Sequence, residues 1–299
     1  GLLMGGADVI PGVSGGTVAL IVGIYERLIH SIQAAASMPS ALLVGDRREA
    51  RQHLREVEWG FVLPLAAGIM CAIAVGALVI PGLLERYPAQ MHALFFGLVA
   101  ASLPIPWRRI SRVTWASVWV AAAAAGAAVV LVGIPPREFA DPPLWQVFAS
   151  AAAAICAMIL PGVSGAFLLK VLGVYSVTLA SLRALDAAYV AVFILGAVIG
   201  LGLFSKLLGW LLERRHDVTM AALVGLMAGS LRALWPWQRW AQEDDRTLLA
   251  PAVDPSLAGI IALGALGFLA VWLLGHWGAA RDRADREAEV PVRGSGDAD

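Results

Sequence analysis

Long apolar runs with almost no charge constrain this sequence more than any other feature. Six of them approach or exceed the ~20 apolar residues that cross a bilayer as a helix. These six are Trp59–Leu84, Met91–Trp107, Thr114–Gly133, Ala187–Leu212, Val218–Trp235 and Ser256–Trp277. Only 15% of the 299 residues are charged, whereas about a quarter are charged in an average soluble protein. The sequence therefore predicts an all-α polytopic membrane protein, because a helix satisfies its own backbone groups in lipid.

Two further apolar segments, Gly1–Tyr25 and Leu144–Tyr175, are each interrupted by Pro-Gly-Val-Ser-Gly. A helix should break there, because the residue before proline disfavours helix and glycine tolerates unusual backbone angles. The arm from Thr17 to Arg27 would be about 16 Å long at ~1.5 Å per residue, half of a ~30 Å hydrocarbon core. These segments favour re-entrant hairpins with tips near the midplane. The alternative is a pair of ordinary spanning helices, each with a kink.

The sequence also repeats itself at two offsets. At an offset of 150, Ile10–Tyr25 matches Leu160–Tyr175 at seven of 16 positions, and at an offset of 128, Leu83–Leu103 matches Leu211–Leu231 at ten of 21. The difference of 22 residues predicts an insertion in the first half. Each repeat then holds one re-entrant helical hairpin and three transmembrane helices. An odd number of crossings turns the second copy upside down, which gives the two inverted repeats of many transporters.

We accordingly predict a single membrane transport domain over residues 1–278, with repeat one at about 1–133 and repeat two at about 144–278. The insertion, at about 37–58, is expected to be an amphipathic cytoplasmic helix on the membrane surface, with a solvated loop as the alternative. Residues 279–299 are polar and of mixed charge, and we expect a disordered cytoplasmic tail.

Arginine distribution predicts the orientation, because Lys and Arg concentrate on the cytoplasmic side. One set of segment ends holds 14 of the 22 basic residues. They are Arg27, Arg47, Arg48, Arg51, Arg55, Arg108, Arg109, Arg112, Arg214, Arg215, Arg281, Arg283, Arg286 and Arg293. These ends are expected to be cytoplasmic, so the first hairpin enters from the cytoplasm and the second from outside.

Each interrupted segment is expected to expose the start of a half-helix to a polar cavity. The first N–H groups of such a helix lack intrahelical partners and carry the positive end of its dipole, which attracts anions. Ser14 or Thr17 could cap the first half-helix, and Ser164 the second. Two facing tips would then form one anion site. Its candidate binding residues are Pro11, Gly12, Ser14, Gly15, Gly16, Thr17, Pro161, Gly162, Ser164 and Gly165.

Three charged residues within or beside the apolar segments extend this site, because intramembrane charge is costly and usually functional. Lys170 and Arg232 could neutralise an anion, and Asp8 could carry a proton and couple transport to it. The alternatives are a structural ion pair for Asp8 and Lys170, and snorkelling of Arg232 to an interface.

Several other functions are disfavoured. Gly12-Val13-Ser14-Gly15 fits the pattern around an intramembrane serine nucleophile, but the five histidines lie at segment ends, away from any such serine. The sequence has neither a phosphate-binding P-loop nor a His/Cys cluster, so we expect no cofactor and no metal. A net charge of zero also argues against a nucleic-acid partner. The chain is therefore not expected to be an enzyme.

The segment Met4–Thr17, together with Gly23-Ile24-Tyr25-Glu26, closely resembles the signature of a bacterial family of undecaprenyl-phosphate translocases, the PopT type, formerly a domain of unknown function. The second Pro161–Gly165 motif and the pattern of spans fit as well, so the resemblance covers nearly all of the chain before Ala279. Ala166 and Phe167 depart from the first tip and leave open how much the second tip contributes.

The resemblance implies a flippase in the bacterial cytoplasmic (inner) membrane. It would return undecaprenyl phosphate from the outer to the inner leaflet for peptidoglycan and other envelope synthesis, coupled to protons or another ion. The runner-up is a secondary transporter or channel for a small soluble anion, which would need no opening to lipid. The partners are then the polyprenyl phosphate lipid and the bilayer, and a homo-oligomer remains open.

Overall fold

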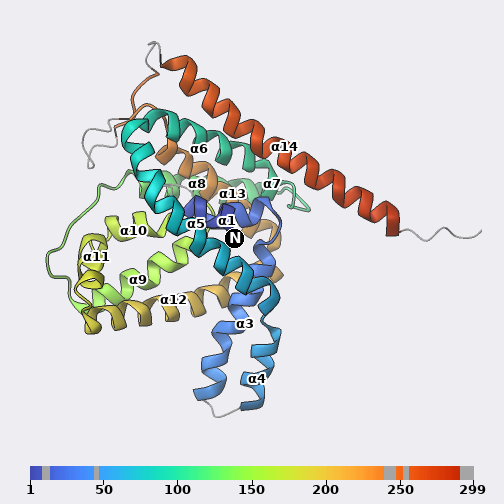
Figure 1. The fold of residues 1–299 in the computed structure, drawn as a ribbon. Coiled ribbons are helices and arrows are strands. Elements are labelled where there is room, and N and C mark those ends of the chain that lie inside the picture. Colours follow the sequence, from blue (N-terminus) through green and yellow to red (C-terminus); the bar gives the residue numbers. More distant parts are fainter. Residues whose placement is uncertain (9–13, 44–46, 239–246, 252–255, 290–299) are drawn as a thin grey trace, which may run out of the picture.

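The computed structural model describes residues 1–8, 14–43, 47–238, 247–251 and 256–289. Within these ranges every regular element is a helix, α1 to α14 and the 3-10 helix η1, and the one β-bridge pairs Gln238 with Leu248. The expected all-helical class is confirmed for this part of the chain. Figure 1 shows the helices and their order, with α14 lying along α6.

Five segments of the described chain are long and apolar enough to cross a membrane. They are α5 (Trp59–Arg86), α6 with α7 (Pro88–Ser102, Pro104–Trp107), α8 (Trp115–Gly133), α12 (Ala187–Arg214) and α13 with η1 (His216–Ser230, Leu231–Leu234). A sixth is added if α10 (Gly165–Val171) and α11 (Tyr175–Arg183), which meet at a bend of 106°, form one broken span. The chain is therefore a multi-pass membrane protein, and five of the six predicted runs fall on these segments.

The two halves of the chain contain helices of equal length in the same order. α5 and α12 both have 28 residues, and α6 and α13 both have 15, at the offset of 128 that the sequence match gives. α2 (Gly15–Ile21) and α10 both have seven residues at the offset of 150. Each is followed by a glycine in the left-handed region, Gly23 and Gly173, both at φ +76°.

Matching glycines also bring matching helices together. Gly97 in α6 lies against α14 (Leu257–Glu289), and Gly225 in α13 lies against α8. A Cβ atom at Gly97 would lie 2.9 Å from the carbonyl carbon of Gly264, and one at Gly225 would lie 2.9 Å from that of Ala121. Small residues let helix backbones approach this closely in lipid, where packing drives association because no hydrophobic effect acts between helices.

The insertion differs from the expected single surface helix. Residues 37–58 cover the end of α3 (Tyr25–Leu43) and all of α4 (Arg47–Glu56), which lie side by side as a projecting hairpin (Figure 1). Arg27 Nε donates a 2.7 Å hydrogen bond to Glu58 Oε2, which joins the start of α3 to the chain entering α5. This hydrogen bond lowers the pKa of the Glu58 carboxyl below its ordinary value, so the ion pair persists at neutral pH.

The C-terminal region also differs from expectation. The predicted span Ser256–Trp277 falls on α14, whose part Leu257–Leu273 is an apolar helix. The helix then continues to Glu289, ten residues beyond Ala279, where the polar composition led us to expect disorder. Residues 290–299 lie outside the described part of the chain.

The glycine contact predicts a sharp difference between two Gly→Leu substitutions. Gly225→Leu should destabilise the protein by about 1–3 kcal/mol or more, because overpacking forces α13 and α8 apart. Gly126→Leu in α8 is the matched control, since nothing lies within 4 Å of a Cβ atom there. Thermal unfolding in detergent measures both. Equal melting temperatures for the two variants would contradict the proposed importance of this helix crossing.

Candidate functional site

The first interrupted segment brings its two arms together through Asp8. α1 (Leu2–Asp8) ends at this residue, and α2 begins at Gly15 after its N-cap Ser14. The Gly15 amide donates a 2.6 Å hydrogen bond to Asp8 Oδ1. The candidate residues Pro11 and Gly12 lie outside the described residues.

The start of α2 has its amide groups satisfied within the chain. Besides Gly15, the Gly16 amide donates to Ser14 Oγ at 3.1 Å and the Thr17 amide donates to the Ser14 carbonyl at 2.9 Å. The sequence predicted that Ser14 or Thr17 would cap this helix, and Ser14 does so. The anion next to these N–H groups is the Asp8 carboxylate, a contact that sequence reasoning missed.

The second interrupted segment follows the same plan without a carboxylate. It runs from α9 (Leu144–Ile159) to α10, and the N-cap Ser164 accepts a 3.3 Å hydrogen bond from the Phe167 amide. The position that corresponds to Asp8 is Met158, whose side chain packs on Gly165. The buried pair Pro161 and Gly162 forms the turn, with Gly162 at φ +81°, where glycine is favoured.

Three hydrogen bonds connect the first hairpin to the end of α9 and to the second tip. Ser14 Oγ donates to the Met158 carbonyl at 3.1 Å, Tyr25 Oη donates to the Ile159 carbonyl at 3.3 Å, and Thr17 Oγ1 accepts from the Gly162 amide at 3.1 Å. Ser14 and Thr17 are both 1% exposed. Ser14 and Thr17 of the first tip therefore lie beside Gly162 of the second, and their hydroxyl groups join the two hairpins.

Close backbone approach explains the second glycine after Ser14, Gly16. A Cβ atom at Gly16 would lie only 2.6 Å from the Ile159 carbonyl oxygen, so a larger residue would push α2 away from the second tip. The second hairpin has Ala166 at the corresponding position. The requirement for glycine is therefore specific to the first hairpin.

Lys170 lies at the other end of its half-helix, six residues and about 9 Å of helix from Ser164. Its Nζ is 5.3 Å from the centre of the Tyr175 ring, and its carbonyl accepts a 3.0 Å hydrogen bond from the Arg137 amide. The Phe139 amide donates to the nearby Gly173 carbonyl, also at 3.0 Å. Residues 134–143 therefore meet the end of α10, and Lys170 lies at this rim instead of beside the hydroxyl groups of the tips.

Arg232 contacts the last turn of α8. Its Nη1 donates to the Val129 carbonyl at 3.2 Å, and its guanidinium carbon would lie 2.9 Å from a Cβ atom at Gly133. A cation is favourable at a helix C-terminus, where the dipole is negative. This contact fits the structural alternative for Arg232 better than a role in neutralising an anion at the tips.

A charged cluster that sequence reasoning missed surrounds the end of α2. Arg109 Nη2 lies 3.5 Å from the Leu20 carbonyl, and Arg109 Nη1 lies 3.6 Å from Glu26 Oε1. The same Glu26 oxygen is 3.7 Å from His216 Nε2, and Asp217 accepts hydrogen bonds from the Ser111 and Arg112 amides. These contacts place three arginine-rich segment ends on one side of the protein, as the charge pattern indicated.

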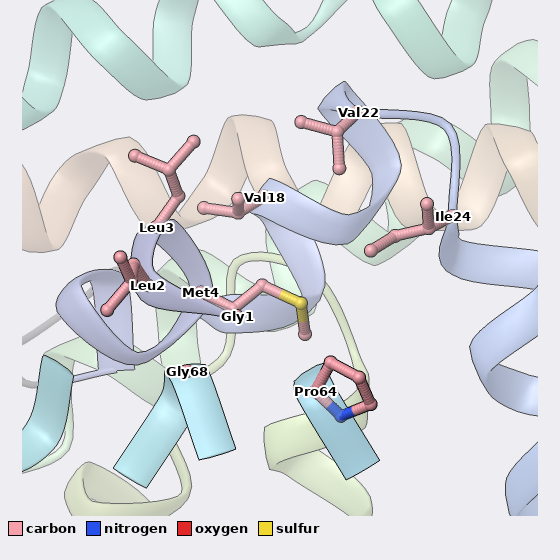
Figure 2. A pocket seen from close by; sticks show the side chains of 9 residues that line it. All are labelled: Gly1, Leu2, Leu3, Met4, Val18, Val22, Ile24, Pro64 and Gly68. Carbon is pink, nitrogen blue, oxygen red and sulfur yellow. The ribbon is translucent and has the colours of Figure 1, made fainter. Parts of the chain in front are cut away.

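An apolar groove of about 510 Å³ lies beside the first hairpin. Figure 2 shows Leu2, Leu3 and Met4 of α1 on one side, and Val18, Val22 and Ile24 of α2 and the following turn on the other. Pro64 and Gly68 of α5 complete the wall. This groove was not anticipated from the sequence.

Comparison with known proteins identifies the family. The model of the undecaprenyl phosphate translocase-like family matches residues 4–248. This chain belongs to that family. The polyprenyl-phosphate transporter of Vibrio cholerae is 40% identical over 243 residues, which are 80% of this chain and 76% of the relative. The polyprenyl-phosphate transporter of Staphylococcus aureus is 29% identical over 256 residues, 79% of this chain and 84% of the relative. No solved structure gives a significant match.

Membership of the translocase-like family confirms the resemblance and the prediction that the chain is not an enzyme. The Ser14 environment agrees, because a nucleophilic serine needs a base within hydrogen-bond reach. The partners of Ser14 Oγ are the Met158 carbonyl and the Gly16 amide.

The bond between the tips leads to a prediction for Thr17. Thr17→Val should destabilise the protein by about 1–3 kcal/mol, because the buried Gly162 amide loses its acceptor. Thr17→Ser is the control that keeps the hydroxyl. Thermal unfolding and hydrogen exchange at the Gly162 amide report the change. Unaltered protection of that amide in Thr17→Val would show that the hydrogen bond is dispensable.

Proposed function

We propose that this chain is a flippase that returns polyprenyl phosphate, undecaprenyl phosphate in particular, from the outer to the inner leaflet of the bacterial cytoplasmic membrane. The observation that carries this proposal is the 40% identity to the polyprenyl-phosphate transporter of Vibrio cholerae over most of both chains. The recycled carrier lipid would supply the synthesis of peptidoglycan and other envelope polymers. A small soluble anion is the weaker substrate, because both relatives are named for the lipid.

Two inverted repeats with re-entrant hairpins would provide the transport pathway. The support for a re-entrant hairpin is that the start of α9 lies next to the end of α10. The Gln146 side chain at the start of α9 donates to the Leu172 carbonyl after α10 at 3.3 Å. The equal lengths of α5 and α12 and of α6 and α13 support the repetition. On this proposal the side that carries Arg109 and His216 is cytoplasmic, by the excess of arginine.

The phosphate would reach and occupy the site in two steps. Lys170 at the outer rim would attract it first, because a lysine ammonium binds phosphate as a point charge. The tips would hold it next, through Ser14, Thr17 and the amides of Gly15 and Gly162. The remaining candidates, Pro11, Gly12, Gly16, Pro161, Ser164 and Gly165, would shape this site. Arg232 would support the site from η1, because its hydrogen bond to the Val129 carbonyl of α8 holds η1 in place.

Asp8 would be the coupling residue. Its carboxylate accepts the Gly15 amide that a phosphate at α2 would use, so the two anions compete for one donor. Repulsion between them disappears when Asp8 takes up a proton. Proton uptake would therefore accompany loading of the tips, and release of the proton on the cytoplasmic side would accompany return of Asp8 to Gly15. Protons are then the coupling ion that drives lipid return.

Reconstitution tests the function directly. Proteoliposomes that contain the full chain and labelled undecaprenyl phosphate should move the label to the opposite leaflet, whereas protein-free liposomes should not. Lys170→Met should slow this movement, and Lys206→Met should not, because Lys206 is exposed on α12. No transfer by the wild-type protein, with an imposed pH gradient of either sign, would refute the proposed function.

The coupling role is tested by Asp8→Asn. Asparagine keeps an oxygen that accepts the Gly15 amide but cannot take up the proton, so lipid binding should persist while transport stops responding to an imposed pH difference. Asp141→Asn, in an exposed loop, is the matched control. A normal response of the Asp8→Asn variant in the same proteoliposomes would remove Asp8 from the coupling mechanism.

A further inference from the structure

The apolar groove beside the first hairpin has the size of a ligand site. Its volume of about 510 Å³ lies within the ~300–1,000 Å³ typical of small-molecule pockets. α1 forms one wall, α5 closes the base, and Val18, Val22 and Ile24 form the other wall (Figure 2). The same short helix α2 carries the groove on its flank and Ser14 at its start, so the groove runs alongside the site at the tips.

The groove is accessible from the side of the protein. Within the described part of the chain, Leu2, Leu3 and Val22 are 61%, 65% and 48% exposed. In a bilayer they contact lipid chains. Burial of one hydrocarbon in place of another gains little hydrophobic energy there. Selection must instead come from shape, and branched side chains such as Val18, Val22 and Ile24 suit a chain with a methyl branch on every unit.

A cation lies next to the turn that contributes two of the lining residues. Gly23 stands between the lining residues Val22 and Ile24, and a Cβ atom at Gly23 would lie 3.4 Å from Arg109 Nη2. The guanidinium already pairs with one anion, the Glu26 carboxylate, at 3.6 Å. Arginine also binds phosphate through two parallel hydrogen bonds. An apolar groove with a guanidinium next to its turn complements an amphiphile with a hydrocarbon tail and an anionic head.

The corresponding turn of the second hairpin is covered by a different side chain. Gly173 has the same φ of +76° as Gly23, but the Phe139 ring packs directly on it. An aromatic ring therefore covers the second turn where Arg109 covers the first. The two hairpins therefore differ in which group contacts the turn itself, since the cation of the second hairpin, Lys170, lies on α10.

We infer that the groove between α1, α2 and α5 seats the isoprene units next to the phosphate of a polyprenyl phosphate, with Arg109 facing the phosphate. The inference rests on the proposed function and adds a subsite to it, separate from the tips. The remainder of the prenyl chain extends into the bilayer past Leu2 and Leu3. On the proposed orientation this subsite lies on the cytoplasmic side and holds the lipid as its head leaves the tips.

Filling the groove tests the inference. Val22→Trp places an indole in it, and Val130→Trp is the matched control, because Val130 is 66% exposed on α8, away from the groove. Binding of undecaprenyl phosphate to the full chain in nanodiscs, measured by native mass spectrometry, should weaken about tenfold for Val22→Trp, which corresponds to about 1.4 kcal/mol. Val130→Trp should bind like the wild type, and both variants should keep the wild-type melting temperature.

A second measurement needs no variant. An undecaprenyl phosphate analogue with a photoreactive group in its first isoprene units should label peptides that contain Leu2–Met4 or Val18–Ile24 in the wild-type protein. Labelling confined to other segments would overturn the inference. This experiment decides the question even if Val22→Trp folds poorly.

The outcomes separate the subsite from the function. If the wild type binds no undecaprenyl phosphate, the proposed function fails together with the subsite. If the wild type binds it and Val22→Trp matches Val130→Trp, the groove is not the subsite and the function stands. If Val22→Trp loses only bound phosphatidylglycerol, the groove holds ordinary bilayer lipid and the inference is overturned.

Discussion

A helix that breaks inside a membrane must find partners for the backbone groups it frees, because lipid offers none. In this protein the freed groups of one break are satisfied by the other. The Gly162 amide donates to Thr17 Oγ1, and the Met158 carbonyl accepts from Ser14 Oγ. The second hairpin therefore depends on the first, although they are about 150 residues apart in the sequence. Separation of the tips would need a substitute that accepts from an amide and from a hydroxyl, and a phosphate can do both.

Close helix packing holds the hairpins where these bonds can form. α1 lies against α5 near Gly68, and α9 lies against α12 near Gly196, which is the matching position at the offset of 128. A Cβ atom at Gly68 would lie 2.9 Å from the Gly1 Cα atom, and one at Gly196 would lie 3.0 Å from the Phe148 carbonyl carbon. The arm of each hairpin is thus fixed on a long helix of its own repeat. The contacts of α1 with α5 and of α9 with α12 set the positions of the two tips. Helix packing away from the site therefore determines the geometry of the site.

The parts of the structure that follow from local pattern could be predicted from the sequence. Apolar run length identified five spans, and the Ser14 cap follows from its place before Gly15 and Gly16. Contacts between distant segments could not be predicted. No local signal shows that Asp8 would fill the start of α2, that Arg232 would cap α8, or that Arg109 would reach the Gly23 turn. For the same reason the sequence predicted a single surface helix in the insertion and not the pairing of α3 with α4, which depends on tertiary contact.

The two hairpins share a backbone plan but differ in charge at each corresponding point. At the offset of 150, Asp8 corresponds to Met158 and Leu20 corresponds to Lys170. The Gly23 turn contacts Arg109, whereas the corresponding Gly173 turn contacts Phe139. A site with identical halves would have no chemical preference for one side of the membrane. On the proposed function, the cation of the second hairpin is part of its own half-helix, whereas that of the first belongs to a neighbouring segment and shares Glu26. The phosphate would meet the Lys170 ammonium on entry and the Arg109 guanidinium on exit. Because Arg109 already pairs with Glu26, that pairing would weaken its hold on the phosphate and favour release on the side that carries Arg109.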